Sequence, residues 1–327
     1  MNRPPLKKLL MSMGFSFCLS GISGSAMDWP SPDGIVTANF GLNEQGRPCL
    51  GTVFRSEGPI RSADQGELVF YRAQEEKASR LPSPLGSWAA YDHGDGILGI
   101  YSRFAEEEEP EEDSRGGIPP EETGQPDSAG ALPAANAVVP FRPGEPPVQP
   151  RQGETVGVSG ISGWSAQKGF YFSLYDRRER RWVNPSLIIV PFPDDRPPEI
   201  LSVQLQDSAG RLIPPGQTRI GQGRYSIIAA VTDTLSRSPS VRLAPHRLGV
   251  SLNGAEAGSL NFETFSARDG VLSVRRNGLA PVSEVYAPYP ALKMGEAWFT
   301  RGQTSLELIA RDVMGNEASL IKRLEVE

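Results

Sequence analysis

The chain has very few histidine and cysteine residues, the side chains that most often bind zinc or act in nucleophilic catalysis in hydrolases. Its 327 residues include only two histidines, His93 and His246, and only two cysteines, Cys18 and Cys49. A hydrolytic zinc centre takes three protein ligands and keeps a further position open for water. Two histidines, one in each half of the chain, do not favour such a centre.

Long apolar segments are also lacking. Residues 1–26 place Arg3, Lys7 and Lys8 before a modestly apolar stretch and end on three small residues. This order is typical of a cleaved secretory signal, and the apolar part is too short and too rich in serine and glycine for a membrane anchor. No later stretch is apolar enough to cross a membrane. We expect a secreted protein of the periplasm or cell envelope, with no membrane span after signal cleavage.

Cysteine is scarce, and positive charge does not predominate. Once the signal is removed, Cys49 would be the one cysteine left, so the mature protein would have no intramolecular disulfide even in an oxidising compartment. The formal net charge is -6, and loss of the three positive charges of the signal takes it to -9. This balance does not favour nucleic acids or other polyanions as partners.

Glycine and proline, by contrast, are abundant, with 35 and 30 residues, and strongly periodic helical stretches are hard to find. Short apolar runs separated by turn signals predict an all-β chain. The length is enough for two domains, and the proline-rich run before residue 199 has the composition of a rigid linker. We predict a first domain over residues 28–193 and a second over residues 199–327.

The second domain is predicted to be an immunoglobulin-like β-sandwich. Turn signals such as Asn253-Gly254 separate its short apolar runs, as in a sandwich of antiparallel strands. Residues 310–318 resemble the A-x-D-x-x-G-N signature near the last hairpin of many secreted immunoglobulin-like modules, where Gly315-Asn316 would tolerate positive φ. The apolar runs are residues 200–203, 225–231, 248–252, 271–274, 306–310 and 321–326.

Residues 105–150 break the pattern of the first domain. They open with an acidic block that includes Glu106 to Glu109 and continue as a run rich in proline, glycine, glutamate and alanine. Such a segment cannot bury enough apolar surface to offset its ordering entropy, so we expect a disordered insertion. An acidic docking tail or a loose Ca²⁺ site is the alternative, although blocks of like charge are usually only solvated.

A set of spaced glycine and turn motifs resembles a known family. Gly153, Gly157, Ser159-Gly160 and Ser162-Gly163, followed by Val183-Asn184-Pro185, resemble the last part of lysostaphin/LytM-type zinc peptidoglycan endopeptidases. The resemblance extends over about residues 28–191 outside the insertion. It implies a LytM-like open β-sheet/barrel fold for the first domain.

The sequence departs from that family at each position where active relatives hold zinc. The family's H-x-G-x-D motif falls on Cys49 and Val53, and its H-x-H window contains Phe170 and Phe172 but no histidine. Arg103 stands where active relatives keep a histidine that assists the reaction. The resemblance therefore implies no catalytic residue, no bound metal and no cofactor, with Phe170 or Phe172 filling the emptied site.

A fold of this kind without its zinc ligands would still have a cleft, and we expect that cleft to serve as a binding groove. Aromatic side chains and cations in the segments that border the cleft of relatives would stack on sugars or hold peptide carboxylates. Trp88 is a further candidate at this border. The predicted groove residues are Tyr101, Arg103, Trp164, Lys168 and Tyr171.

The leading hypothesis is a catalytically inactive peptidase-homology protein of the cell envelope that binds peptidoglycan or regulates a cell-wall hydrolase. One alternative is an active peptidoglycan metalloendopeptidase, or a cryptic thiol hydrolase with a Cys49–His93 pair. A lone buried cysteine is more often inert packing, and we expect His93 to be a structural turn residue. The other alternative is a structural envelope interaction module whose second domain contacts a partner.

Overall fold

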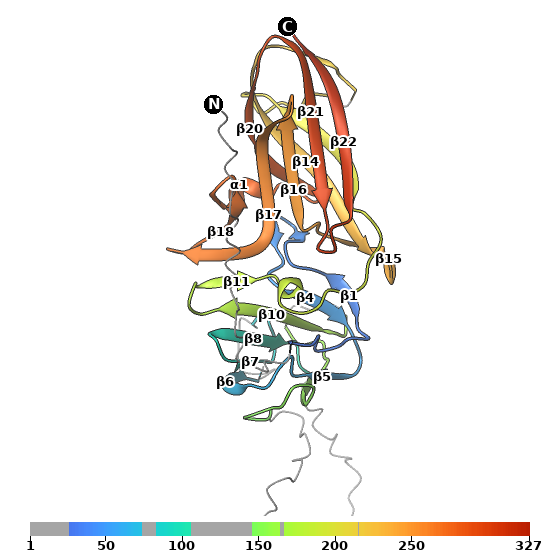
Figure 1. Cartoon of the computed structure of the whole chain (residues 1–327). Coiled ribbons are helices and arrows are strands. Elements are labelled where there is room, and N and C mark those ends of the chain that lie inside the picture. The colour runs from blue at the N-terminus through green and yellow to red at the C-terminus, as the bar shows by residue number, and fades with distance from the viewer. Residues whose placement is uncertain (1–25, 74–82, 106–145, 164–166, 215) are drawn as a thin grey trace, which may run out of the picture.

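The structure is a computed structural model, and it describes residues 26–73, 83–105, 146–163, 167–214 and 216–327 (Figure 1). The signal expected before residue 26, most of the expected insertion and Trp164 lie outside these ranges. Within them, nearly all regular structure is β-strand, so the all-β prediction is confirmed. No helix in the described part of the chain is long and apolar enough to cross a membrane.

The first domain is built from short strands joined by turns. Its longest strand is β10, whose sequence FYFSLYD is rich in the aromatic residues that strands favour. A single turn of 3-10 helix, η1 (Pro185–Leu187), follows the last strand and begins at the Asn184 cap. The strands are β1 (Ile35–Ala38), β2 (Asn43–Glu44), β3 (Arg47–Pro48), β4 (Thr52–Arg55), β5 (Pro59–Arg61), β6 (Glu67–Arg72), β7 (Trp88–Asp92), β8 (Ile97–Ser102), β9 (Thr155–Val158), β10 (Phe170–Asp176) and β11 (Arg181–Val183).

Strand β10 organises the first domain. Along one edge it pairs antiparallel with β8, and β7 and β6 follow in order. Along its other edge it pairs with β4 at its start and with β11 at its end. Among the described strands this sheet remains open and does not close into a barrel.

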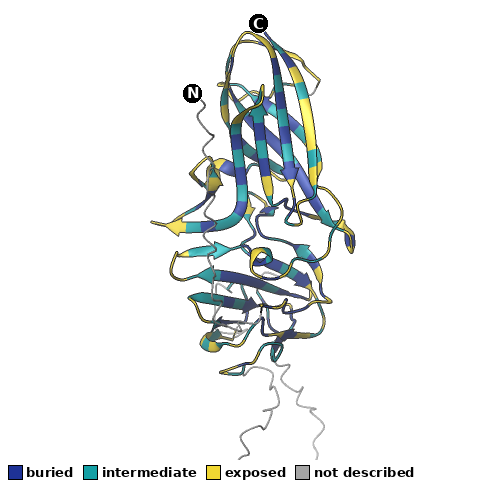
Figure 2. Cartoon of the chain, viewed as in Figure 1, coloured by how far each residue is buried: buried dark blue, intermediate teal, exposed yellow. Residues whose placement is uncertain are grey.

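Alternation along β10 gives the domain one buried face. Phe170 and Phe172 are fully buried, Phe170 stacks on Phe54 with ring centroids 4.8 Å apart, and Phe172 packs against Tyr101. Residues of opposite parity point away from this core, because successive side chains of a strand project to opposite faces. Figure 2 shows the same dark, buried band through the lower part of the molecule.

The second domain is a two-sheet β-sandwich. One sheet runs β13-β22-β21-β16-β17, and the other places β14 between β12 and β20, with β15 on the far end of β14. Apolar side chains of both sheets form one core, which includes Ile227, Phe262 and Leu308. The elements are β12 (Glu199–Gln206), β13 (Arg219–Ile220), β14 (Gly223–Leu235), β15 (Ser238–Leu243), β16 (Arg247–Leu252), β17 (Ala255–Arg268), β18 (Val271–Arg276), β19 (Leu279–Pro281), α1 (Val282–Val285), β20 (Ala291–Phe299), β21 (Gly302–Arg311) and β22 (Glu317–Val326).

One long strand joins the two domains. The first part of β17 pairs with β16 inside the sandwich, and residues 264–266 pair with β11 of the first domain. Strand β17 therefore continues the sheet of the sandwich into the sheet of the first domain, as the middle of Figure 1 shows. The two domains are joined by backbone hydrogen bonds as well as by the 190–198 segment.

Candidate functional site

The candidate site begins at the short hairpin of β2 and β3, which leads into Cys49. Gln45 and Gly46 both have positive φ in the turn, and the Gly46 amide donates to the Asn43 side chain at 2.8 Å. The Cys49 amide donates to Leu42 at 2.9 Å, which fixes the cysteine at the end of the hairpin. Its position follows from local turn chemistry, because positive φ at both central residues is what a tight two-residue hairpin requires.

Cys49 is buried and chemically quiet. Its side chain is 3% exposed, and its thiol donates to the Gly51 carbonyl at 3.3 Å. Burial, helped by the nearby negative charge of Glu44, raises the pKa of the thiol to about 12. The group is therefore a neutral thiol at physiological pH, and a neutral thiol is a poor nucleophile.

Tyr171 is a residue of β10 whose phenol lies near Cys49, and Ser173 lies on the same face of the strand. Burial raises the pKa of the Tyr171 phenol well above its ordinary value, and the neighbouring Cys49 raises it further. A Cβ placed on Gly51 would lie 2.8 Å from the Ser173 Cβ, so Gly51 lies close beside β10, one position beyond the Thr52–Phe172 pair of the β4–β10 ladder. Phe170 and Phe172, which are predicted to fill the emptied ligand position, both point into the core, on the face of β10 opposite to Tyr171.

Val53 lies beside Tyr171 on the adjacent strand. The two are direct partners in the β4–β10 ladder, and Ser102 is the partner of Tyr171 on the β8 side. Trp88 is in turn the partner of Ser102, so these side chains form a row on one face of the sheet. Trp88 is half-buried and stacks on the exposed Phe70 ring, with 4.7 Å between centroids.

Arg103 brings positive charge to this row. Its backbone has φ 67°, and its guanidinium carbon lies 5.9 Å from the centroid of the Tyr171 ring, within the range of a cation–π contact. Partial burial raises the pKa of the Glu44 carboxyl, and the charge of Arg103 opposes that rise. The site thus combines one carboxyl, one guanidinium, one neutral thiol and one neutral phenol.

This set of groups does not fit zinc. A hydrolytic zinc centre uses imidazole, carboxylate or thiolate ligands, and the described residues at this site offer the single carboxylate of Glu44. The guanidinium of Arg103 would repel a cation at the same position. The arrangement instead presents a cation with aromatic rings beside it, which suits binding of carboxylates and sugar rings.

The structure separates the other predicted groove residues from Arg103 and Tyr171. Tyr101 is fully buried, and its hydroxyl accepts from the Ala63 amide at 2.8 Å, so its prediction as a groove residue is wrong. It faces the core because its β10 partner is Phe172, which lies on the core face. Lys168 is exposed just before β10, and Trp164 lies outside the described residues.

Sequence reasoning missed Glu44 and Phe70. Glu44 belongs to a strand of two residues, which has no periodic pattern to read. A hollow of about 890 Å³ lies elsewhere in the first domain, between residues 27–35 and 55–62, and neither Arg103 nor Tyr171 lines it. The candidate site lies on a face of the sheet, apart from this hollow.

Cys49 and His93 do not form a catalytic pair in the described structure. The His93 ring contacts the Gln65 carbonyl at 2.9 Å and the Tyr101 hydroxyl at 3.1 Å, in the turn after β7. The cysteine thiol is instead bonded to Gly51. Burial also lowers the pKa of His93, so the ring favours its neutral form and serves to join the turn to the core.

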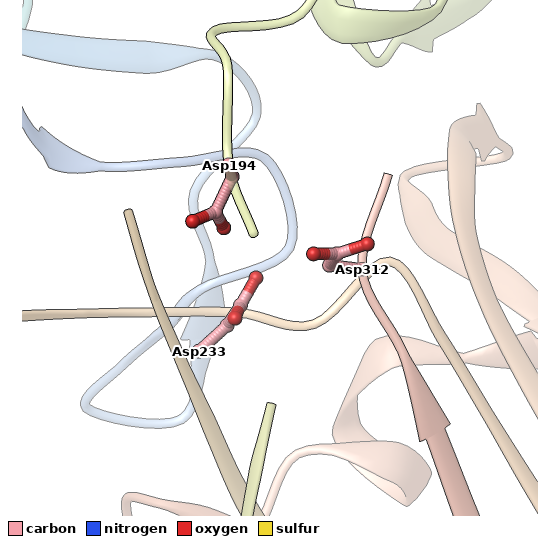
Figure 3. Close-up of side chains that lie close together, drawn as sticks. All are labelled: Asp194, Asp233 and Asp312. Carbon is pink, nitrogen blue, oxygen red and sulfur yellow. The ribbon is translucent and has the colours of Figure 1, made fainter. Parts of the chain in front are cut away.

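A second cluster of polar side chains lies where the two domains meet (Figure 3). Asp194 from the linker, Asp233 from β14 and Asp312 from the turn after β21 have carboxylate oxygens within 4.8 Å of one another. Oxygen ligands at this spacing are the kind that Ca²⁺ or Mg²⁺ takes. Asp312 already accepts two hydrogen bonds from Asn316, and acidic groups alone do not define a metal site.

Comparisons with known proteins return weak similarities. No curated protein sequence matches the chain, and a protein-family model that carries no functional description matches residues 197–327. A mutant catalytic domain of the prophage-encoded M23 protein EnpA from Enterococcus faecalis is 16% identical, with a TM-score of 0.29, over 46% of this chain and 86% of that chain.

Two further solved structures are similar to the chain. Lysostaphin, an antimicrobial peptidase from Staphylococcus simulans, is 12% identical with a TM-score of 0.30, over 84% of this chain and 98% of that chain. A zinc-containing peptidase from Vibrio cholerae is 15% identical with a TM-score of 0.31, over 51% of this chain and 41% of that chain. At these values the comparisons assign the chain to no family.

Proposed function

We propose that this chain is a non-catalytic cell-envelope protein that binds peptidoglycan through the face formed by Arg103, Tyr171 and Trp88. Its first domain has the motif spacing of a LytM-type peptidase but not the groups that such a peptidase needs. The solved structures that resemble it include lysostaphin, described as an antimicrobial peptidase. The proposal places the protein outside the cytoplasm, after removal of the secretory signal expected over residues 1–26.

The observation that carries the proposal is the chemistry around Cys49. The family resemblance puts Cys49, a buried neutral thiol, where active relatives hold zinc with a histidine, and Arg103 lies 5.9 Å from the Tyr171 ring. The guanidinium would pair with a carboxylate of a peptide stem, and the Trp88 ring with the exposed Phe70 beside it would stack on sugar rings. These contacts bind but transfer no group.

Sedimentation with isolated peptidoglycan tests the proposal. Arg103→Ala should weaken binding about tenfold or more, because a hydrogen bond to a charged partner contributes about 1.5–3 kcal/mol. The matched control is Arg180→Ala, which removes the same charge from an exposed position in the turn after β10. Equal binding by both variants would count against this face.

Metal content tests the absence of catalysis. The purified protein should carry no stoichiometric zinc and should release no peptides from peptidoglycan. Wall-cleaving activity that a chelator abolishes would overturn the proposal. A Cys49→Ser variant that lost such activity would point to the thiol hydrolase instead.

A further inference from the structure

The segment from Asn39 to Leu50 precedes the linker in the sequence, yet its side chains pack into the second domain. Phe40 is 1% exposed and belongs to the core of the sandwich, with its ring centroid 5.1 Å from that of Phe265. The Asn39 side chain donates to the Ala244 carbonyl at 2.9 Å and accepts from the Ala244 amide at 2.7 Å. One aromatic ring and one amide thus fix the start of this segment to the second domain.

Gly41 and Asn43, the next residues that contact the second domain, are held as closely as Asn39 and Phe40. Gly41 has φ +90°, and a Cβ placed on it would lie 2.6 Å from Cγ of Phe262. Its carbonyl accepts from the Tyr286 hydroxyl at 2.8 Å, and Tyr286 follows α1 of the second domain. Asn43 donates to the carbonyl of Ala287 at 2.7 Å.

This segment also carries the candidate site. The Gly41 amide donates to the Cys49 carbonyl at 2.8 Å. Gly41 is therefore hydrogen-bonded both to Tyr286 and to Cys49. Glu44 lies in the hairpin between them. Beyond Cys49, Gly51 approaches the Phe172 carbonyl so closely that a Cβ would lie 2.2 Å from its oxygen. A chain of contacts therefore runs from Tyr286 through Gly41 and Cys49 to β10.

We propose that the second domain is a brace for the candidate site, with Tyr286 as the positioning residue that fixes Gly41 and, through it, the Glu44–Cys49 hairpin against β10. A role of Tyr286 in ligand binding rests on the function proposed above. Its role in positioning the Glu44–Cys49 hairpin rests on the contacts alone. In this arrangement the second domain is part of the site's framework and not a separate module on a linker.

Hydrogen exchange of the full chain tests the brace without any ligand. Tyr286→Phe removes one hydroxyl and should speed exchange of the Gly41 and Cys49 amides about threefold to tenfold, the effect expected for one lost hydrogen bond. Tyr225→Phe is the matched control, since its hydroxyl donates to the Gly221 carbonyl at the same 2.8 Å within the second domain. Unchanged exchange at Gly41 and Cys49 in the Tyr286 variant would overturn the proposal.

Peptidoglycan sedimentation then separates this inference from the proposed function. If both hold, Tyr286→Phe lowers binding while its melting temperature falls no further than that of Tyr225→Phe, and Tyr225→Phe leaves binding unchanged. Faster exchange with no binding by the wild-type protein would keep the brace and refute the function. Normal binding together with faster exchange in the Tyr286 variant would refute the positioning role.

Discussion

Replacing Asp233 by asparagine should change how the stability of this protein depends on pH. Asp233 lies in β14, is 6% exposed, and has the carboxylates of Asp194 and Asp312 nearby. Burial raises the pKa of the Asp233 carboxyl to about 8, the amide of Thr234 opposes the rise, and the two neighbouring charges add to it. Asparagine has nearly the same shape and keeps an oxygen for the Thr234 amide, but it cannot ionise.

The direction of the change of stability with pH follows from which state, folded or unfolded, holds the proton of Asp233. The folded-state pKa is about 8 and the ordinary value is 3.8, so between these pH values the folded protein binds a proton that the unfolded chain has lost. Stability is then highest at low pH and falls as pH rises, by up to about 1.4 kcal/mol per pH unit. Above about pH 8 both states are ionised, and the loss is complete. In Asp233→Asn this slope disappears.

Urea unfolding at each whole pH value from pH 5 to pH 9 measures how the free energy of unfolding depends on pH. At pH 8 the asparagine variant should be more stable than the wild type by about 2 kcal/mol or more, with the difference shrinking toward pH 5. Asp95→Asn is the control, because the Asp95 side chain is 97% exposed. Parallel curves for the wild type and Asp233→Asn would refute the reasoning.

The other predictions concern Gly51 and Cys49, which lie close to β10. Gly51→Ala should destabilise the protein by about 1–3 kcal/mol, because the new Cβ would lie 2.2 Å from the Phe172 carbonyl oxygen. Gly58→Ala, where a Cβ would meet nothing within 4 Å, should leave the denaturation midpoint nearly unchanged, and equal midpoints would contradict this account. Cys49 in the native protein should react with a thiol reagent at pH 8 at least about a hundredfold more slowly than in urea-unfolded protein. Rapid labelling of the native protein would show that its thiol is not buried.

The sequence predicted the strands well where the pattern is local. Alternating aromatic residues predicted a strand at residues 170–175, and β10 is Phe170–Asp176. Asn253 and Gly254 both take positive φ, as their turn requires. In the last hairpin only Gly315 has positive φ, and Asn316 instead donates to Asp312 and to the Asp194 carbonyl.

The candidate site was harder to predict, because it depends on which face each residue takes. The motif spacing put Phe170 and Phe172 in the H-x-H window, but spacing alone does not tell which face of the sheet a side chain takes, and neighbouring residues of a strand lie on opposite faces. Tyr101 was predicted to line the groove because its segment borders the cleft in relatives, yet its ring is fully buried. The contact of Phe40 with Phe265 joins residues far apart in the sequence, and no local pattern predicts such a pair.

The place of Phe40 limits how this architecture can be recombined during evolution. A cut within residues 190–198 divides the chain at its sequence boundary but not at its packing boundary, because the Phe40 ring belongs to the core of the second domain. Loss of a buried ring of this size costs about 3–5 kcal/mol. A first domain of this kind joined to a new second domain would need a pocket for that ring. Residues 39–50 and 262–286 are therefore expected to be inherited together.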